Sequence, residues 1–401
     1  MNNLSHKRIL LGITGGIAAY KSADLVRRLR DHGAEVRVVM TKGACEFITP
    51  LTMQALSGNP VHTKLMDPRS EAMIGHIELA RWSDVVIVAP ASANFIARLA
   101  HGMADDLLST LCLAADVPLL IAPAMNRRMW LNPATQDNIA LLQSRNIMSL
   151  GPAEGQQACG EEGPGRMLEP AELIQEVSNV FHTELLIGMN ILVTAGSTRE
   201  AIDPVRYISN RSSGRMGYAI ARAATEAGAG VTLVSGPASQ QPPDRVHCIE
   251  VTTAAQMHDA VMAAIGITDI FVAAAAVADY RCAKVAPQKL KKNDASISLT
   301  LEKTTDILAE VADMPDPPFT VGFAAETENL EENARHKLQT KGLDMIAANQ
   351  VGEQLGFDSE DNALELYWDT GRLSLEQAPK EKLARQLIHI IAENFHEKRS
   401  N

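Results

Sequence analysis

The chain has 401 residues, of which 46% are hydrophobic and 21% are charged, and its formal net charge is −11. This balance is typical of globular domains and excludes wholesale disorder, and a single hydrophobic core rarely grows beyond about 250–300 residues, so the length predicts two or three domains. The acidic charge argues against a partner that is nucleic acid or an anionic membrane, although a local basic pocket could still hold a phosphate.

Targeting signals and cysteine usage point to the cytoplasm. Residues 1–8 are too polar to open a secretory signal, and no apolar run reaches the roughly 18–20 residues that a membrane span needs. The 5 cysteines lie far apart without a Cys-x-x-Cys pair, which favours reduced thiols over a disulfide framework or a zinc cluster. We therefore expect a soluble, cytoplasmic protein with no membrane or nucleic-acid partner.

The two halves of the chain open in the same way. Residues 8–13 form an apolar run that enters a glycine turn at 14–16, and a helical pattern and a second apolar run follow it. Near residue 190 the pattern restarts with the apolar run 190–195, a glycine, and a helical pattern over 217–227. Strands that alternate with helices of this length indicate βαβ units and parallel sheets.

Further apolar runs are continuous rather than alternating, which is typical of strands buried on both faces. They cover residues 85–89, 119–122 and 270–276. The helical pattern over 171–181 joins the halves without a low-complexity linker. We expect an α/β protein with two tandem doubly wound (Rossmann-like) parallel-sheet domains, residues 1–189 and 190–401.

The first glycine turn does not match the dinucleotide fingerprint, which needs G-x-G-x-x-G and an acid at the end of the second strand. Residues 12–16 read Gly-Ile-Thr-Gly-Gly, and the second strand ends at Thr41 and Lys42. Residues 234–236 in the second half also lack the acid. Such a turn could be only a tight connection, but its backbone N–H groups commonly bind phosphate. A mononucleotide such as FMN is favoured over NAD for the first half.

Three segments of the first half follow predicted strands, at the edge where an open sheet binds its ligands. They are residues 90–94, 123–130 and 158–167, the last being rich in Gly and Pro around Cys159. This last segment is typical of a flexible flap. His76 could be a general base near neutral pH. Taken singly, a histidine is more often structural and a cysteine more often an inert small hydrophobe.

These motifs together resemble two known families. Residues 14–21, 75–77, 123–126 with 129–130, and the Cys159 flap are similar to the flavin-containing cysteine decarboxylases. With residues 203–210, 212–214 and 275–280, the whole chain resembles the bacterial family of coenzyme A synthesis that fuses a phosphopantothenate–cysteine ligase to a phosphopantothenoylcysteine decarboxylase.

For the first half, the resemblance implies a flavodoxin-like domain that binds FMN. The cysteine moiety of the substrate would be oxidised to a thioaldehyde-like state, which gives decarboxylation an electron sink. His76 matches the catalytic histidine, Asn126 the residue that holds the substrate carboxylate, and Cys159 the flap cysteine that protonates the enethiolate. The expected flavin contacts, two of them inferred from position more than from a motif, are Gly15, Gly16, Thr41 and Ser92.

For the second half, the resemblance implies a nucleotide-binding domain that joins L-cysteine to 4′-phosphopantothenate through an acyl-cytidylate, with CTP as co-substrate and Mg²⁺ spreading the triphosphate charge. Lys289 matches the lysine that forms this intermediate, and Asn210 matches the residue that turns it over. The basic segment 289–292 could otherwise be a solvated loop. The expected CTP contacts are Asp279, Lys289, Thr305, Asp306, Ile307, Leu308, Phe323, Lys337 and Lys341.

Two points qualify these CTP contacts. Lys337 and Lys341 are four residues apart, so one helix face could present both to the phosphates, although an exposed helix face explains them as well. Thr304-Thr305 stands where the family usually has Asn-Pro, so the turn beside the nucleotide should differ. The sequence assigns no metal ligands.

The resemblance also implies a homo-oligomer, a dodecamer built from trimers of the flavin half and dimers of the ligase half. Three alternatives remain. A flavin-dependent decarboxylase of peptidyl cysteine and a flavin-modifying transferase share the first half but leave residues 190–401 unexplained. A non-catalytic regulatory relative could dispense with His76 or Cys159, and this chain keeps both.

Overall fold

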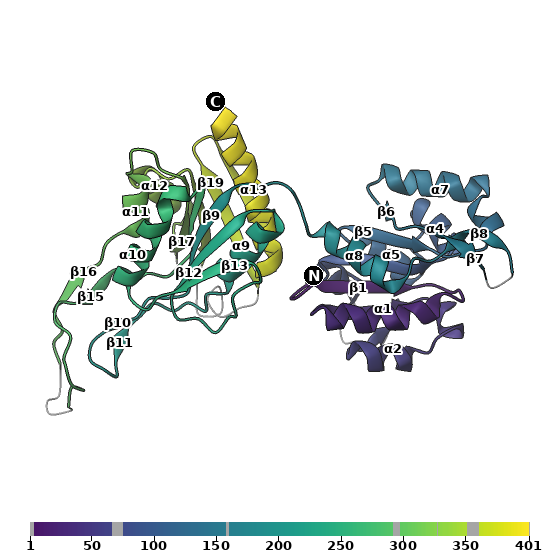
Figure 1. Cartoon of the computed structure of the whole chain (residues 1–401), viewed down its shortest axis with the longest axis horizontal. Coiled ribbons are helices and arrows are strands. Elements are labelled where there is room, and N and C mark those ends of the chain that lie inside the picture. The colour runs from purple at the N-terminus through teal and green to yellow at the C-terminus, as the bar shows by residue number, and fades with distance from the viewer. Residues whose placement is uncertain are drawn as a thin grey trace. The chain divides into compact units, whose positions relative to one another are not determined.

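The structure is a computed structural model that describes residues 4–65, 75–157, 160–291, 297–326, 328–350 and 361–400. The chain divides into two compact units, Met1–Phe181 and His182–Asn401, and each has its own sheet (Figure 1). Among the described residues, no helix combines the length and the apolar character that crossing a bilayer requires.

The first unit is built on a six-stranded sheet in the order β3-β2-β1-β4-β5-β6, with every neighbouring pair parallel. Its strands are β1 (Arg8–Ile13), β2 (Glu35–Met40), β3 (Val61–His62), β4 (Val85–Ala91), β5 (Leu119–Pro123) and β6 (Met148–Ser149). The strand order reverses between β1 and β4, and this switch point is where doubly wound sheets bind ligands.

Helices cover both faces of this sheet, as the continuously apolar strands predict. One core packs against α1 (Ala19–Asp31), α2 (Pro50–Ser57) and α8 (Pro170–Val180). The other packs against α3 (Gly75–Trp82), α4 (Ala93–Ala100), α5 (Leu107–Ala114) and α7 (Pro133–Ser144). A short helix, α6 (Arg127–Trp130), a 3₁₀ turn (Ala44–Glu46) and an antiparallel hairpin of β7 (Ala153–Gln156) and β8 (Glu162–Arg166) complete the unit.

The second unit has an eight-stranded sheet in the order β13-β12-β9-β14-β17-β18-β19-β20. The parallel strands are β9 (Asn190–Ala195), β12 (Gly230–Ser235), β13 (Val246–Glu250), β14 (Ile270–Ala273), β17 (Phe319–Glu326) and β18 (Met345–Gln350). An antiparallel edge, which the sequence patterns above did not predict, is formed by β19 (Asp361–Trp368) and β20 (Gly371–Pro379).

The helices of the second unit also lie on both faces. On one face are α9 (Arg215–Glu226) and α13 (Lys380–Ser400), and on the other are α10 (Ala254–Ala264), α11 (Ile307–Ala312) and α12 (Leu330–Thr340). A 3₁₀ turn (Ile265–Ile267) follows α10. Two small ribbons extend away from the sheet (Figure 1): β10 (Glu200–Ala201) with β11 (Tyr207–Ile208), and β15 (Tyr280–Cys282) with β16 (Leu301–Lys303).

Residues 182–189, assigned above to the first half, pack in the second unit. Leu186 is fully buried in the second core, and its amide donates to the carbonyl of Ala227 at 2.8 Å. Phe181 is buried in the first core, where the Lys7 ammonium lies 4.5 Å from its ring centroid. The boundary between the two units along the sequence therefore falls between Phe181 and His182.

We predict that residues 182–401 form a more stable fragment than residues 190–401. The shorter fragment lacks Leu186, and losing a fully buried leucine costs about 2 kcal/mol. Urea unfolding of both fragments measures the difference, with residues 1–181 expected to unfold cooperatively alone. Equal midpoints for the two C-terminal fragments would show that residues 182–189 add nothing to the second core.

Candidate functional site

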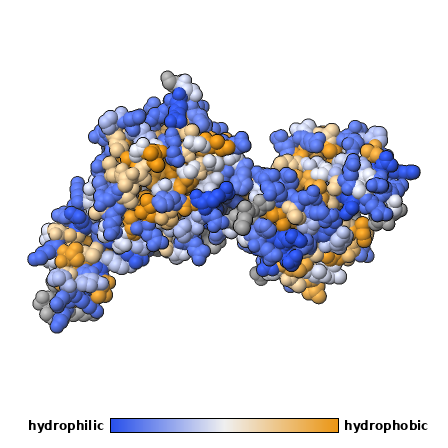
Figure 2. Space-filling view, viewed as in Figure 1, coloured by the Kyte–Doolittle hydropathy of each residue, from blue (hydrophilic) through white to orange (hydrophobic). Residues whose placement is uncertain are grey.

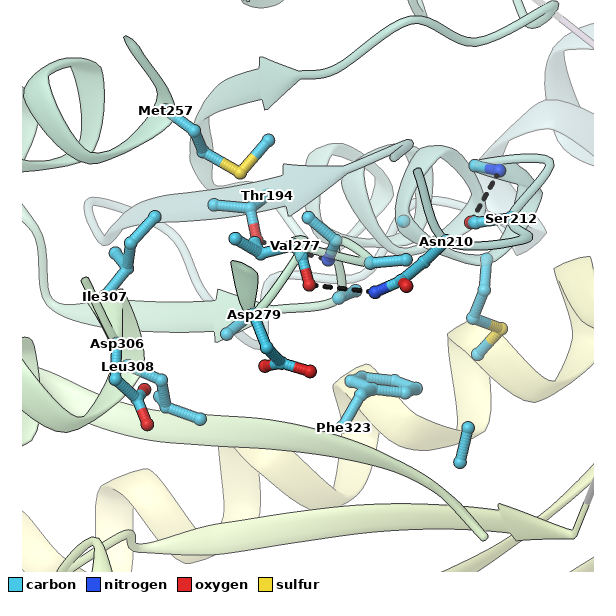
Figure 3. Close-up of a pocket in the computed structure, with 18 of the residues that line it drawn as sticks. Thr194, Asn210, Ser212, Met257, Val277, Asp279, Asp306, Ile307, Leu308 and Phe323 are labelled. Carbon is cyan, nitrogen blue, oxygen red and sulfur yellow. Dashed lines mark hydrogen bonds between the residues drawn. The ribbon is translucent and has the colours of Figure 1, made fainter. Parts of the chain in front are cut away.

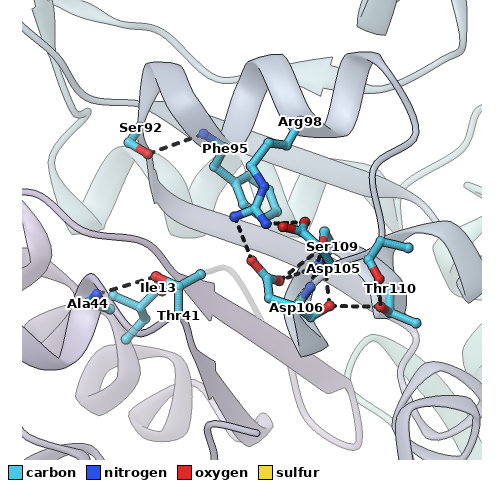
Figure 4. A network of polar contacts seen from close by, with 11 residues as sticks. Ile13, Thr41, Ala44, Ser92, Phe95, Arg98, Asp105, Asp106, Ser109 and Thr110 are labelled. Atoms are coloured by element: carbon cyan, nitrogen blue, oxygen red, sulfur yellow. Dashed lines mark hydrogen bonds and ion pairs between the residues drawn. The ribbon is translucent and has the colours of Figure 1, made fainter. Parts of the chain in front are cut away.

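The turn after β1 is tied to the turn after β4 at the switch point of the first sheet. The Thr14 hydroxyl donates to the carbonyl of Pro90 at 2.7 Å and accepts the amide of Ser92 at 2.9 Å. The Ser92 hydroxyl accepts the amide of Phe95 at 3.3 Å and so caps α4 (Figure 4). These bonds hold Ser92 beside the first glycine turn.

The same turn packs against the turn after β2. A Cβ on Gly15 would lie 2.9 Å from the carbonyl carbon of Gly43, so a side chain there would force the backbones apart, while a Cβ on Gly16 would meet nothing within 4 Å. The Thr41 hydroxyl, 3.4 Å from the Ile13 carbonyl, also accepts the amide of Ala44 at 3.3 Å (Figure 4). All four expected flavin contacts thus lie at the carboxyl ends of β1, β2 and β4, where backbone N–H groups can cradle a phosphate.

A cluster of charges fixes the loop before α5, a feature that the sequence analysis missed. Arg98 forms ion pairs with Asp105 and Asp106 (Figure 4), and the Asp106 carboxylate accepts the amide of Ser109 at 2.8 Å. Asp106 thereby caps α5, whose Leu108 lies so close to Gly12 that an added Cβ would approach it to 2.5 Å. The sequence does carry a signal for this, because Asp at the N-cap and Ser three residues later form a capping box.

Asn126 contacts the hairpin that the sequence predicts as a flap, close to the turn between β7 and β8. Its side-chain amide donates to Glu161 at 2.7 Å, and the amide of Met125 donates to the carbonyl of Gly165 at 2.9 Å. A Cβ on Gly165 would lie 2.3 Å from the Met125 carbonyl oxygen, so the two backbones are in direct contact. Cys159 falls in the sequence between β7 and β8 and lies outside the described residues.

His76 is the second residue of α3 and is half-buried. Helix α3 packs against β1 and α5, the elements that carry the first glycine turn and the Asp106 cap. Its catalytic assignment continues to rest on the resemblance.

A cavity of about 1050 Å³ lies at the carboxyl ends of β9, β14 and β17 in the second unit (Figure 3). The loops 210–217, 273–280 and 303–308 contribute most of its lining. The lining includes nine of the residues that the sequence predicts for the ligase site: Asn210, Asp279, Thr305, Asp306, Ile307, Leu308, Phe323, Lys337 and Lys341.

Short hydrogen bonds hold these loops in place. The Asn210 amide donates to the Val277 carbonyl at 2.9 Å (Figure 3), and the Thr304 hydroxyl donates to the Ala278 carbonyl at 2.6 Å. Asp306 caps α11 by accepting the amide of Ala309 at 3.1 Å. The turn 304–306, where the resemblance leads us to expect Asn-Pro, is therefore closed by Thr304 and Asp306.

The lysines of α12 and its end are already paired with acids. Lys337 lies 2.6 Å from Glu326, and Lys341 lies 2.7 Å from Asp306. A polyphosphate entering here would compete with these carboxylates. Sequence reasoning missed four further cations that line the cavity, which no local motif marks: Arg211, Arg215, Lys303 and Lys380.

Lys289 is exposed and does not line the cavity that the described residues form. The next residue, Leu290, is pinned to the turn 203–206: its amide donates to Asp203 at 3.1 Å, and its carbonyl accepts from Arg206 at 2.5 Å. Burial opposes ionisation of Asp203, but the amides of Val205, Leu290 and Arg206 and the Arg206 guanidinium lower its pKa to about 2.

Within the described parts of the chain, no three His, Cys, Asp or Glu side chains are grouped as a metal site.

Comparisons with known proteins cover both units. The family described as "Flavoprotein" matches residues 1–182, and the "DNA/pantothenate metabolism flavoprotein C-terminal domain" matches residues 186–395. A protein of Vibrio vulnificus named "Coenzyme A biosynthesis bifunctional protein CoaBC" is 56% identical over 395 residues, covering 98% of each chain. The protein of that name from Escherichia coli K12 is 51% identical over 402 residues, covering 99% of each chain.

Solved structures resemble one unit at a time. The C-terminal domain of a CoaBC protein is 39% identical and covers 54% of this chain and 100% of that one, with a TM-score of 0.47. The FMN-dependent cysteine decarboxylase SpaF is 31% identical and covers 44% of this chain and 99% of that one, with a TM-score of 0.39.

We predict that Asp203→Asn frees the segment that carries Lys289. A neutral amide cannot match the charge-assisted bonds to three amides and a guanidinium, so the Leu290 amide should exchange about tenfold faster at neutral pH. Hydrogen–deuterium exchange measures this, with the exposed Asp369→Asn as control. Unchanged exchange at Leu290 would mean that other contacts hold the segment.

The stability that the Asp203 carboxylate contributes depends on pH with a definite sign. A carboxylate whose folded pKa is about 2, below its usual value of about 3.9, stabilises the fold fully above pH of about 4. That contribution is lost as the pH falls through about 2. The segment should therefore remain protected at pH 5.

Proposed function

The chain belongs to the family of coenzyme A biosynthesis bifunctional proteins, and from this premise we propose that its two units divide a ligase and a decarboxylase between them. Residues 182–401 would join L-cysteine to 4′-phosphopantothenate with CTP. Residues 1–181 would decarboxylate the product to 4′-phosphopantetheine with FMN. The observation that carries the proposal is that relatives of this name match both units at 56% identity over 98% of the chain.

The switch-point turns of the first unit suit an FMN phosphate. The near contact of Gly15 with Gly43 leaves room for backbone but not for side chains, and Ser92 and Thr41 add hydroxyls on either side. When bound, FMN would accept two electrons from the cysteine moiety and return them after loss of CO₂.

Three residues of the first unit would handle the proton and the carboxylate. We assign removal of the first proton to His76, because an imidazole side chain commonly serves as a general base. Asn126 would orient the substrate carboxylate. Its side-chain amide now donates to the Glu161 carboxylate at 2.7 Å, and a substrate carboxylate could accept the same hydrogen bond in place of Glu161. Cys159 would protonate the enethiolate.

For the ligase, the cavity of about 1050 Å³ is large enough for a nucleotide and an acyl group together. Lys337 and Lys341 would turn from their acids to the triphosphate. Mg²⁺ would enter with the triphosphate, since this ion is usually held by substrate phosphates and one or two carboxylates, and Asp279 lies exposed in the cavity. Asn210 would help cysteine attack the acyl-cytidylate. Lys289 could stabilise its formation only if the segment that carries it approaches the bound nucleotide.

We further propose that the protein acts as a homo-oligomer in the cytoplasm. The ribbon β15–β16 and its extension expose apolar side chains, seen as orange patches on the extension from the second unit (Figure 2): Val285, Ile297, Leu299 and Leu301 are each 42–51% exposed. A second copy that covered them would remove this apolar area from water. The four described cysteines are free thiols, which suits a reducing compartment.

Two substitutions should separate the steps of the ligase. Lys289→Gln removes the cation for the triphosphate step, so pyrophosphate release should fall by at least about 100-fold. Asn210→Asp should still release pyrophosphate but form no phosphopantothenoylcysteine. Lys284→Gln, an exposed lysine of the same segment, is the control. Equal loss of pyrophosphate in both variants would contradict this division of roles.

Substitutions of Cys159 and His76 should separate the steps of the decarboxylase. Cys159→Ser replaces a thiol with a pKa near 8.5 by a far weaker acid, so CO₂ should form while the flavin bleaches and does not recover without oxygen. His76→Asn should prevent bleaching altogether. The control is Cys45→Ser. Burial raises the pKa of the Cys45 thiol, which makes this thiol a poor proton donor, so its substitution should leave the flavin cycle unchanged. Flavin absorbance reports each case, and normal turnover by Cys159→Ser would mean that this cysteine has no acid role.

A further inference from the structure

The hydrogen bond between Asn126 and Glu161 places a carboxylate of the chain itself at the residue that we assign to the substrate carboxylate. The side-chain amide of Asn126 donates to Oε2 of Glu161 at 2.7 Å, and Nε of Arg128 lies 3.7 Å from Oε1. An amide and a cation thus hold the two oxygens of one carboxylate. Neither the expected site residues nor the relatives' names give Glu161 a role.

The orientation of the Asn126 amide is fixed from its other end. Its Oδ1 accepts the backbone amide of Arg128 at 2.8 Å, which makes Asn126 the N-cap of α6. An amide group whose oxygen accepts there directs its nitrogen the other way, so Nδ2 has to meet an acceptor on the opposite side. Glu161 supplies that acceptor.

The turn of the hairpin brings Glu161 to this position. The Gln157 amide donates to the carbonyl of Glu161 at 2.8 Å. The Gln157 side chain then joins the hairpin to the loop of Asn126, because its Oε1 accepts the Arg127 amide at 3.0 Å and its Nε2 donates to the Pro164 carbonyl at 3.1 Å. The bond from Asn126 to Glu161 is therefore part of a contact that fastens the hairpin to this loop.

The bond from Asn126 to Glu161 can open without unfolding the hairpin. The Glu161 side chain is 38% exposed and that of Arg128 is 87% exposed, so water would solvate both charges once the contact opened. A substrate carboxylate carries the same charge and the same two oxygens, and it can accept from the same amide. The two carboxylates therefore exclude each other at Asn126.

We propose that Glu161 is a built-in competitor of the substrate carboxylate, which holds the Asn126 amide in its donor orientation until phosphopantothenoylcysteine displaces it. The proposal rests on the role given to Asn126 in the proposed function. Only a ligand that carries a carboxylate must displace Glu161, so the contact lowers the affinity for the substrate and not for the decarboxylated product. Loss of CO₂ removes the competing carboxylate, and the return of Glu161 then favours release of 4′-phosphopantetheine.

The test compares Glu161→Ala and Glu161→Gln with Glu162→Gln, an exposed acid of β8 one residue further along. Without the competitor, KM of the full chain for phosphopantothenoylcysteine should fall about tenfold in Glu161→Ala. It should fall less in Glu161→Gln, whose neutral oxygen can still accept a weaker bond. The inhibition constant of 4′-phosphopantetheine should stay the same, and Glu162→Gln should match the wild type in both constants.

The two constants also separate this role from a merely structural one. A hairpin that only became looser would change the binding of substrate and product together. An unchanged KM in Glu161→Ala, or an equal change in both constants, would overturn the proposal. Urea unfolding checks that the variants fold.

Direct binding separates the failure of this proposal from the failure of the proposed function. If the wild-type chain forms no 4′-phosphopantetheine from phosphopantothenoylcysteine, the decarboxylase function fails, but isothermal titration still gives the dissociation constants of both compounds. The proposal then predicts that Glu161→Ala binds phosphopantothenoylcysteine about tenfold more tightly than the wild type and binds 4′-phosphopantetheine equally well. Equal affinities of the two chains for phosphopantothenoylcysteine would overturn it.

Discussion

Close contact between backbone turns at the carboxyl ends of the strands is the constraint on which both units depend. In the first unit Gly15 meets Gly43, and in the second Gly196 meets Gly236, at separations that leave no room for a Cβ. These contacts bring turns from neighbouring strands into one surface of exposed peptide groups. The proposed FMN phosphate site of the first unit is built on such a surface, so this site follows from the packing of the sheet.

Positively charged side chains gather at the larger cavity, although the net charge of the protein is negative. Although the net charge is −11, cations gather around the larger cavity, and Lys337 and Lys341 are held there by Glu326 and Asp306. Pairing lowers the cost of keeping these lysines together before a ligand arrives, and exchange of carboxylate for phosphate then needs only small side-chain movements.

Much of the fold could be predicted from the sequence because continuous apolar runs, such as β4 and β14, have few alternatives to a buried parallel strand. The β19–β20 hairpin was missed, since it interrupts the βαβ pattern that repeats elsewhere. The structure divides the chain at Phe181 and His182, a few residues before the expected boundary at 189, because Leu186 packs on a core that only long-range contacts assemble. The cavity gathers nine expected residues from five separate segments, yet Lys289 lies outside it. Local sequence cannot encode the separation of Lys289 from the cavity. It also cannot encode the pairing of Arg98 with Asp105 and Asp106 across a loop.

The central claim is that one chain forms an amide bond and then removes the carboxylate of the cysteine it has added. The most direct measurement incubates the purified full chain with 4′-phosphopantothenate, L-cysteine, CTP and Mg²⁺ and identifies the products by mass. The account predicts 4′-phosphopantetheine, CMP, pyrophosphate and CO₂ in equal amounts, and no product when CTP is omitted. Absence of 4′-phosphopantetheine from the complete mixture, or its formation without CTP, would contradict it.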